Sequence, residues 1–138
     1  MRLIYEYFFI ILLIVTAIPA FGQGNEELYV QGDKFMKDGQ YYDAYNKYSE
    51  YIRSSPDSLK GYVARGYTQI FLKKVTEAIG DFDMAIKLDS MNYKGYAGKG
   101  AAYMMILNSQ DAARNYLRAI ELNPEDVVSM SSLSVILL

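Results

Sequence analysis

The chain contains no cysteine, no histidine and no tryptophan among its 138 residues. Without cysteine there can be no disulfide and no thiol nucleophile, and without histidine there is no imidazole to act as a general base. The two side chains that most often bind zinc are therefore both missing. These absences argue against an enzyme, and we expect neither a metal ion nor another cofactor.

An excess of one charge sign is also missing. The 14 lysines and arginines nearly balance 16 aspartates and glutamates, which leaves a formal net charge of −2. A nucleic-acid partner is not expected, because binding one requires a concentrated basic face. A hydrophobic content of 51% with 22% charged residues is typical of one folded domain.

One long apolar run is present, over residues 8–18. Arg2 precedes it, and the small residues Ala20 and Gly22 follow it at the −3 and −1 positions of a signal-peptidase cleavage site. This layout predicts a signal peptide over residues 1–22 and export to a periplasm or beyond. The alternative is an uncleaved membrane anchor over residues 3–20, close to the roughly 20 apolar residues that span a bilayer. Contact with a membrane is expected only through this segment.

Three positions recur every 34 residues in the rest of the chain. A glycine is followed by an alanine and, four residues later, by an aromatic ring. The sets are Gly32, Ala44 and Tyr48; Gly66, Ala78 and Phe82; and Gly100, Ala112 and Tyr116. A period of about 34 residues with this pattern indicates a helix–turn–helix repeat. The small residues allow two helices to approach closely, and the ring fills the space beside the contact.

Turn signals divide the chain into three units and a remainder. Pro56 and Pro124 end the first and third units, because proline cannot continue a helix. In the first unit we expect helices over residues 26–37 and 41–53. The units are predicted at 25–58, 59–92 and 93–126, and residues 127–138 form a partial fourth unit or a capping helix.

With these residues the chain resembles the tetratricopeptide repeat (TPR) family. The likeness rests on Leu28, Gly32, Ala44, Tyr48 and Pro56, and on the matching residues of the third unit. It implies an all-α solenoid of antiparallel helix pairs in a right-handed superhelix. The first helix of each unit would line a concave groove, and the implied function is a scaffold for binding proteins. Together with the apolar N-terminus, the likeness predicts an exported TPR protein of bacterial type.

On this resemblance the groove is lined by three rows of residues that recur every 34 positions. The rows are Tyr29, Val63 and Ala97; Asp33, Tyr67 and Ala101; and Met36, Ile70 and Met104. Within one helix the rows are four and three residues apart, so they share a face. Aromatic and methionine surfaces suit varied partners, and we predict a protein or peptide partner of unknown identity. The alternative role of these residues is packing between repeats.

Some members of the family hold an acidic C-terminus with a clamp of lysines and asparagines. The matching positions here carry Tyr29, Asp33, Ala64, Lys94 and Gly98. Only Lys94 agrees with the clamp, so the sequence predicts against that ligand.

Polar residues stand before each glycine, where the family usually has leucine. They are Gln31, Arg65 and Lys99. We expect their stems to lie along the core and their polar heads to reach water. Asp81 and Asp83 are expected on a solvated face, with Asp83 paired to Lys87, because residues two apart on a helix do not converge on a metal.

The end of the chain, from Val135 to Leu138, is apolar. Three interpretations remain open. The chain is the first part of a larger envelope enzyme or peptidoglycan-associated protein, or its last helix docks on a second copy or another subunit, or this helix simply covers the third unit.

Overall fold

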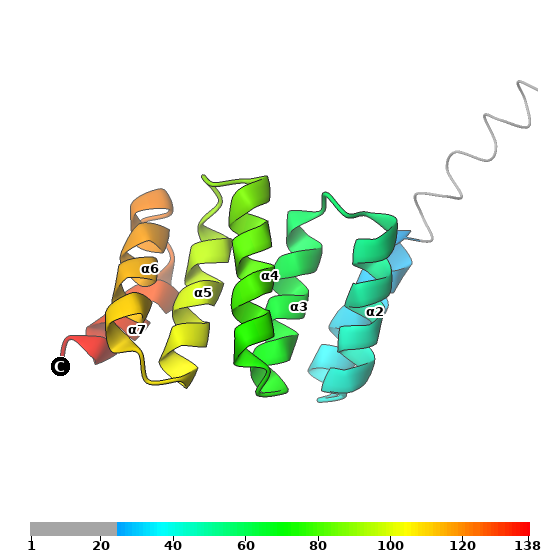
Figure 1. Cartoon of the computed structure of the whole chain (residues 1–138), viewed down its shortest axis with the longest axis horizontal. Helices are drawn as coiled ribbons and strands as arrows, with labels where there is room; N and C mark the ends of the chain where they lie inside the picture. Colours follow the sequence, from blue (N-terminus) through cyan, green and yellow to red (C-terminus); the bar gives the residue numbers. More distant parts are fainter. Residues whose placement is uncertain (1–24) are drawn as a thin grey trace, which may run out of the picture.

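The structure is a computed structural model that describes residues 25–138. The described chain is a row of helices and turns without a strand (Figure 1). Residues 25–37 form the first helix. The others are α2 (Tyr41–Ser54), α3 (Leu59–Phe71), α4 (Val75–Leu88), α5 (Tyr93–Met105), α6 (Ser109–Leu122) and α7 (Val127–Ile136).

Successive helices form antiparallel pairs: residues 25–37 with α2, α3 with α4, and α5 with α6, while α7 packs beside α6 (Figure 1). The helices α3, α5 and α7 begin at Leu59, Tyr93 and Val127, so they follow the 34-residue period of the sequence. Because α3 also contacts α5 directly, the first helices of the units form a continuous layer. This layer carries the predicted groove residues.

The recurring glycine, alanine and ring meet between the two helices of each unit. All three alanines are fully buried: Ala44, Ala78 and Ala112. A methyl group added at Gly66 would lie 2.8 Å from the Phe82 ring, and one at Gly100 would lie 2.9 Å from Tyr116. Carbon atoms pack best at about 3.5–4.0 Å, so a larger residue would displace the ring. The predicted packing role of the glycines is therefore confirmed.

The turn inside each unit places one residue in the left-handed region of the backbone. These residues are Gly39 (φ 73°), Lys73 (φ 60°) and Leu107 (φ 58°). After Lys73, the Lys74 N–H donates to the Gln69 carbonyl at 2.8 Å and closes α3 in a Schellman motif. The sequence indicated this helix stop only at Gly39, because lysine and leucine rarely adopt a positive φ.

The Arg65 side chain is largely covered, with 20% of it exposed, so its head is held by the Asp81 carboxylate rather than extended into water as expected. Its Nε and Nη2 each donate to the Asp81 carboxylate at 2.7 Å, and its Nη1 donates to Ser49 Oγ at 3.3 Å. Asp81, expected at the surface, is only 6% exposed. The reason is that α3 packs between α2 and α4, which brings residues 16 positions apart into contact.

The expected pair between Asp83 and Lys87 is also replaced by a contact between helices. Lys99 Nζ on α5 donates to Asp83 Oδ1 on α4 at 2.6 Å. Gln31 donates to Glu27 at 3.1 Å within its own helix and stays near the surface. Polar groups before the glycines thus connect neighbouring helices in the second and third units.

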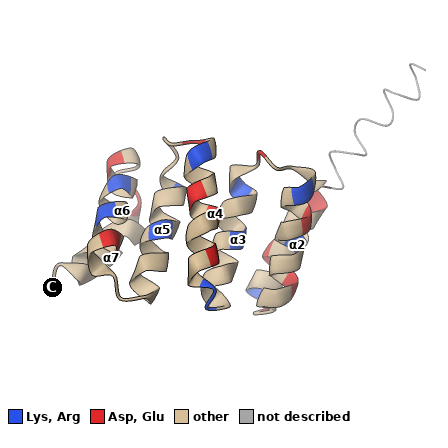
Figure 2. Cartoon of the chain, in the orientation of Figure 1, with Lys and Arg blue, Asp and Glu red and all other residues tan. Residues whose placement is uncertain are grey.

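Charges of both signs lie along most of the described helices (Figure 2). Residues 106–110, in and after the turn that follows α5, carry no charge, and neither do residues 127–138. Large apolar side chains are exposed there, including Leu107 (88%) and Leu137 (74%). The C-terminal end therefore has the most apolar exterior of the described chain.

Candidate functional site

All nine predicted groove residues lie on the first helices of the three units. We call their common side the groove face. The structure separates them into an N-terminal half with Tyr29, Asp33, Met36 and Val63, and a C-terminal half with Ile70, Ala101 and Met104. Tyr67 and Ala97 lie between these two halves. The two halves differ in what their side chains contact.

In the N-terminal half, Tyr29 is covered by neighbouring side chains. Its ring centre lies 5.5 Å from that of Tyr48 and 5.3 Å from that of Tyr51. Lys60 Nζ lies 4.4 Å from the centre of the Tyr29 ring and donates to both carboxylate oxygens of Glu26 at 2.7 Å. The aromatic face of Tyr29 thus already has a cation against it.

The other residues of the N-terminal half also have partners inside the chain. The Tyr48 hydroxyl donates to Asp33 at 2.6 Å, and burial together with this hydrogen bond raises the pKa of Tyr48. Met36 Sδ lies 3.1 Å from the Thr68 hydroxyl, and Val63 is only 8% exposed. Asp33 and Met36 thus each already have a polar contact within the chain, and Val63 is almost fully covered.

Tyr67 and Ala97 contribute mainly to packing. The Tyr67 ring packs edge-on against Phe82 with 5.2 Å between ring centres. Burial raises the pKa of Tyr67 to about 12, with Tyr116 and Asp126 adding to the effect. Ala97 is 7% exposed. For these two residues, the alternative role of packing between repeats describes their surroundings better than ligand contact does.

The C-terminal half surrounds an open pocket of about 330 Å³. Its lining combines the three predicted residues Ile70, Ala101 and Met104 with Met105, Tyr116, Ser132 and Val135. Apart from the hydroxyls of Tyr116 and Ser132, the lining side chains are apolar. The volume falls at the lower end of the range of ligand pockets, about 300–1,000 Å³, and suits apolar side chains of a partner.

Four lining residues were not predicted from the sequence. Tyr116 was assigned to the core as the ring of its unit, and Met105 is the neighbour of Met104. Val135 stands 34 residues after Ala101, so extending the second row into the last helix would have identified it. For Ser132 the sequence carried no signal.

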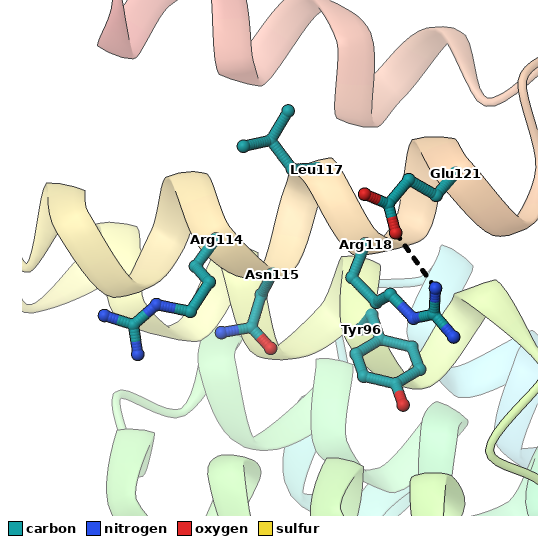
Figure 3. A pocket seen from close by; sticks show the side chains of 6 residues that line it. All are labelled: Tyr96, Arg114, Asn115, Leu117, Arg118 and Glu121. Carbon is teal, nitrogen blue, oxygen red and sulfur yellow. Dashed lines mark hydrogen bonds and ion pairs between the residues drawn. The ribbon is translucent and has the colours of Figure 1, made fainter.

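A second depression, of about 400 Å³, is formed by α6 and by Tyr96 of α5 (Figure 3). By helical periodicity its α6 residues lie on the face opposite Tyr116. Its lining residues are Tyr96, Arg114, Asn115, Leu117, Arg118 and Glu121. Arg118 donates to Glu121 at 2.9 Å, and its guanidinium carbon lies 5.9 Å from the centre of the Tyr96 ring. The charged groups of Arg118 and Glu121 therefore already bind each other within this depression. The pocket on the groove face, whose side chains are mostly apolar and carry no charge, is the better candidate site.

Residues 25–138 contain no cluster of acidic, histidine or cysteine side chains that could hold a metal ion. The helices within this range are too short or too polar to cross a bilayer.

No family model matches the chain. The DnaJ homolog subfamily C member 7 homolog of Schizosaccharomyces pombe is 35% identical over 100 residues, which cover 70% of this chain and 21% of the relative. Hsp70-Hsp90 organizing protein 2 of Arabidopsis thaliana is 30% identical over 103 residues, covering 75% and 18% respectively. The chain thus spans about a fifth of the length of these curated relatives.

Among solved structures, the first TPR of Spaghetti (RPAP3), bound to the HSP90 peptide SRMEEVD, matches with a TM-score of 0.77 and 27% identity. The match covers 83% of this chain and 90% of that one. The fold is that of a TPR domain. The predicted all-α TPR solenoid is therefore confirmed.

The predicted location outside the cytoplasm is contradicted. The relatives found are a DnaJ homolog, an Hsp70-Hsp90 organizing protein and an HSP90-peptide-binding domain of RPAP3, and this finding contradicts the expected export. These relatives are eukaryotic, so they give no support to an exported protein of bacterial type. The signal peptide or anchor predicted over residues 1–22 lies outside the described residues.

Proposed function

We propose that this TPR domain is a non-catalytic module that binds a protein or peptide segment on its groove face. The observation that carries the proposal is the open apolar pocket, to which α3, α5 and α7 each contribute side chains. The peptide bound to the RPAP3 domain supports a peptide as the kind of ligand. The activities of the longer relatives are a separate matter, because the chain matches only a fifth of their length.

The proposed contact surface keeps the nine predicted residues and adds Met105 and Val135 from the pocket. Within it the C-terminal half is the main contact, since the N-terminal half is occupied by internal pairs. Self-association through residues 127–138 stays a prediction, favoured by the exposed Val128 and Leu137.

A quantitative capture experiment tests the proposal. The full chain is immobilised and exposed to extract of the source cells, and bound proteins are compared with those held by two variants. Ala101→Arg places a long charged side chain in the pocket. The control variant Leu117→Arg adds the same side chain on α6, outside the pocket lining, at a residue that is 49% exposed.

We expect a partner that the parent chain and Leu117→Arg capture equally and that Ala101→Arg captures about tenfold less, equivalent to about 1.4 kcal/mol. Circular dichroism checks that both variants remain helical. Equal capture by Ala101→Arg and Leu117→Arg would remove the groove face as the binding site.

A further inference from the structure

We infer that the partner binds through an uncharged, apolar segment that contacts only the C-terminal half of the groove face. This inference rests on the proposed function. An acidic chain end is not the ligand. The ligand is thus defined by aliphatic or methionine-sized side chains rather than by a carboxylate.

The chemistry of the pocket supports an apolar occupant. Ile70, Met104, Met105 and Val135 supply aliphatic or thioether surface, and the lining contains no charged side chain. A carboxylate placed there would lose its water without gaining a cation, which is strongly unfavourable. Transfer of an apolar side chain from water into the pocket would instead have a favourable free energy.

The charges of the N-terminal half disfavour an acidic ligand next to the pocket. Asp33 presents a carboxylate on this half, and its hydrogen bond comes from Tyr48 within the chain. The ammonium of Lys60 is held by both oxygens of Glu26 at 2.7 Å. A ligand carboxylate would therefore meet two aspartate or glutamate side chains and a lysine that is already neutralised.

The arrangement of the pocket sets the minimum length of the segment. Apart from Tyr116 of α6, its lining residues come from three first helices, α3, α5 and α7. Packed helices are about 8–10 Å apart, so the distance from α3 to α7 is roughly 16–20 Å. At about 3.3 Å per residue, an extended segment needs about five or six residues to contact all three helices. Alternate side chains of such a segment would point into the pocket.

Methionine methyl signals report on the two halves separately. The full chain is labelled with ¹³C at the methionine methyl groups and titrated while its NMR spectrum is recorded. Met104 and Met105 line the pocket, and Met36 belongs to the N-terminal half. Met91, which is 68% exposed before α5, is an internal control for non-specific contact.

Three peptides are compared: acetyl-Gly-Ser-Leu-Gly-Leu-Gly-Leu-Ser-Gly-amide, the same peptide with aspartate in place of each leucine, and SRMEEVD. We expect the leucine peptide to shift Met104 and Met105 with saturation while Met36 and Met91 stay in place. Its Kd should be at least about tenfold lower than that of either acidic peptide. Tighter binding of SRMEEVD, an equal shift of Met36, or no shift with the leucine peptide would each overturn the inference.

Two variants near the C-terminal end of α7 form a matched pair for the same titration. Val135→Asp puts a charge in the pocket, whereas Leu137→Asp puts it directly after α7, outside the pocket lining, and both parent residues are exposed (65% and 74%). Val135→Asp should weaken the leucine peptide about tenfold or more, and Leu137→Asp should leave its Kd unchanged. The reverse result, or equal weakening, would place the ligand elsewhere.

The two proposals fail in different ways. A captured partner that Ala101→Arg loses, combined with a leucine peptide that does not bind, overturns the apolar ligand and leaves the groove as the binding site. Equal capture by both arginine variants rejects the groove itself.

Discussion

The two halves of the groove face are built from the same repeat positions, yet only one of them is open. In the second row, Asp33 is bound by Tyr48, Tyr67 packs on Phe82, and Ala101 is small. The pocket exists where an alanine leaves the space that a tyrosine fills one unit earlier. A repeat therefore determines where a side chain lies, while its size and polarity determine whether the position is closed or available.

The largest expected effect tests whether polar side-chain contacts stabilise the second unit more than the third. Asp81→Ala leaves Arg65 partly buried without its carboxylate, and we expect unfolding to become easier by about 3–5 kcal/mol. The matched variant is Asn115→Ala, at the same position one unit later. It loses one hydrogen bond to the Asp111 carbonyl, of 2.8 Å, at a cost of about 0.5–1.5 kcal/mol.

Urea unfolding of both variants gives the comparison. The double variant Arg65→Met/Asp81→Leu should recover part of the loss, because an apolar pair avoids the desolvation of two charges. If Asp81→Ala and Asn115→Ala lower the free energy of unfolding equally, the ion pair between Arg65 and Asp81 does not make the second unit more stable than the third.

An intermediate effect is expected at alkaline pH, at Tyr67 between the two halves. The pKa of Tyr67 is raised to about 12, while that of an unfolded tyrosine is about 10. Between these values the unfolded chain loses the Tyr67 proton and the folded chain keeps it, so stability falls as the pH rises from 10 to 12. Two pKa units correspond to a loss of at most about 2.7 kcal/mol in the free energy of unfolding. The actual loss is smaller, because the ring keeps some contact with solvent.

Tyr67→Phe keeps the ring on Phe82 and removes the titrating group. Its urea midpoint should therefore fall less than that of the parent chain between pH 9 and pH 11.5. Some loss should remain, because burial also raises the pKa of Tyr29 and Tyr116. An identical pH dependence in both proteins would contradict the assigned surroundings of Tyr67.

The smallest effect compares the turns of the first and third units. Leu107 has a φ of 58° and is 88% exposed, so Leu107→Gly should relieve backbone strain while losing little packing. We expect a gain of up to about 1 kcal/mol, lowered by the entropy of glycine in the unfolded chain. Gly39→Ala should have the opposite sign, since Gly39 has a φ of 73°. Thermal midpoints measure both, and a loss for Leu107→Gly would mean that its side chain has a partner.

Part of the candidate site was expected from the resemblance to the TPR family. That resemblance implied Ile70, Ala101 and Met104 as groove residues at equivalent positions of the repeat, and the structure gathers these three around one pocket. Ser132 was missed, and Tyr116 was assigned only to the core, because contacts between the groove face and a later helix do not follow from spacing within a unit. Tyr29 and Tyr67 were predicted as partner-binding groove residues, and in the structure their rings pack against other rings of the chain.

The sequence by itself determined the class of fold, since a glycine, an alanine and a ring at one period permit only closely packed helix pairs. It also placed the nine predicted groove residues on the first helices of the three units. Only the tertiary structure decided that Asp81 is buried against Arg65, that Lys99 reaches Asp83, and that the open pocket is confined to one half. These features depend on packing between different helices, where the bulk and charge of residues far apart in the sequence meet.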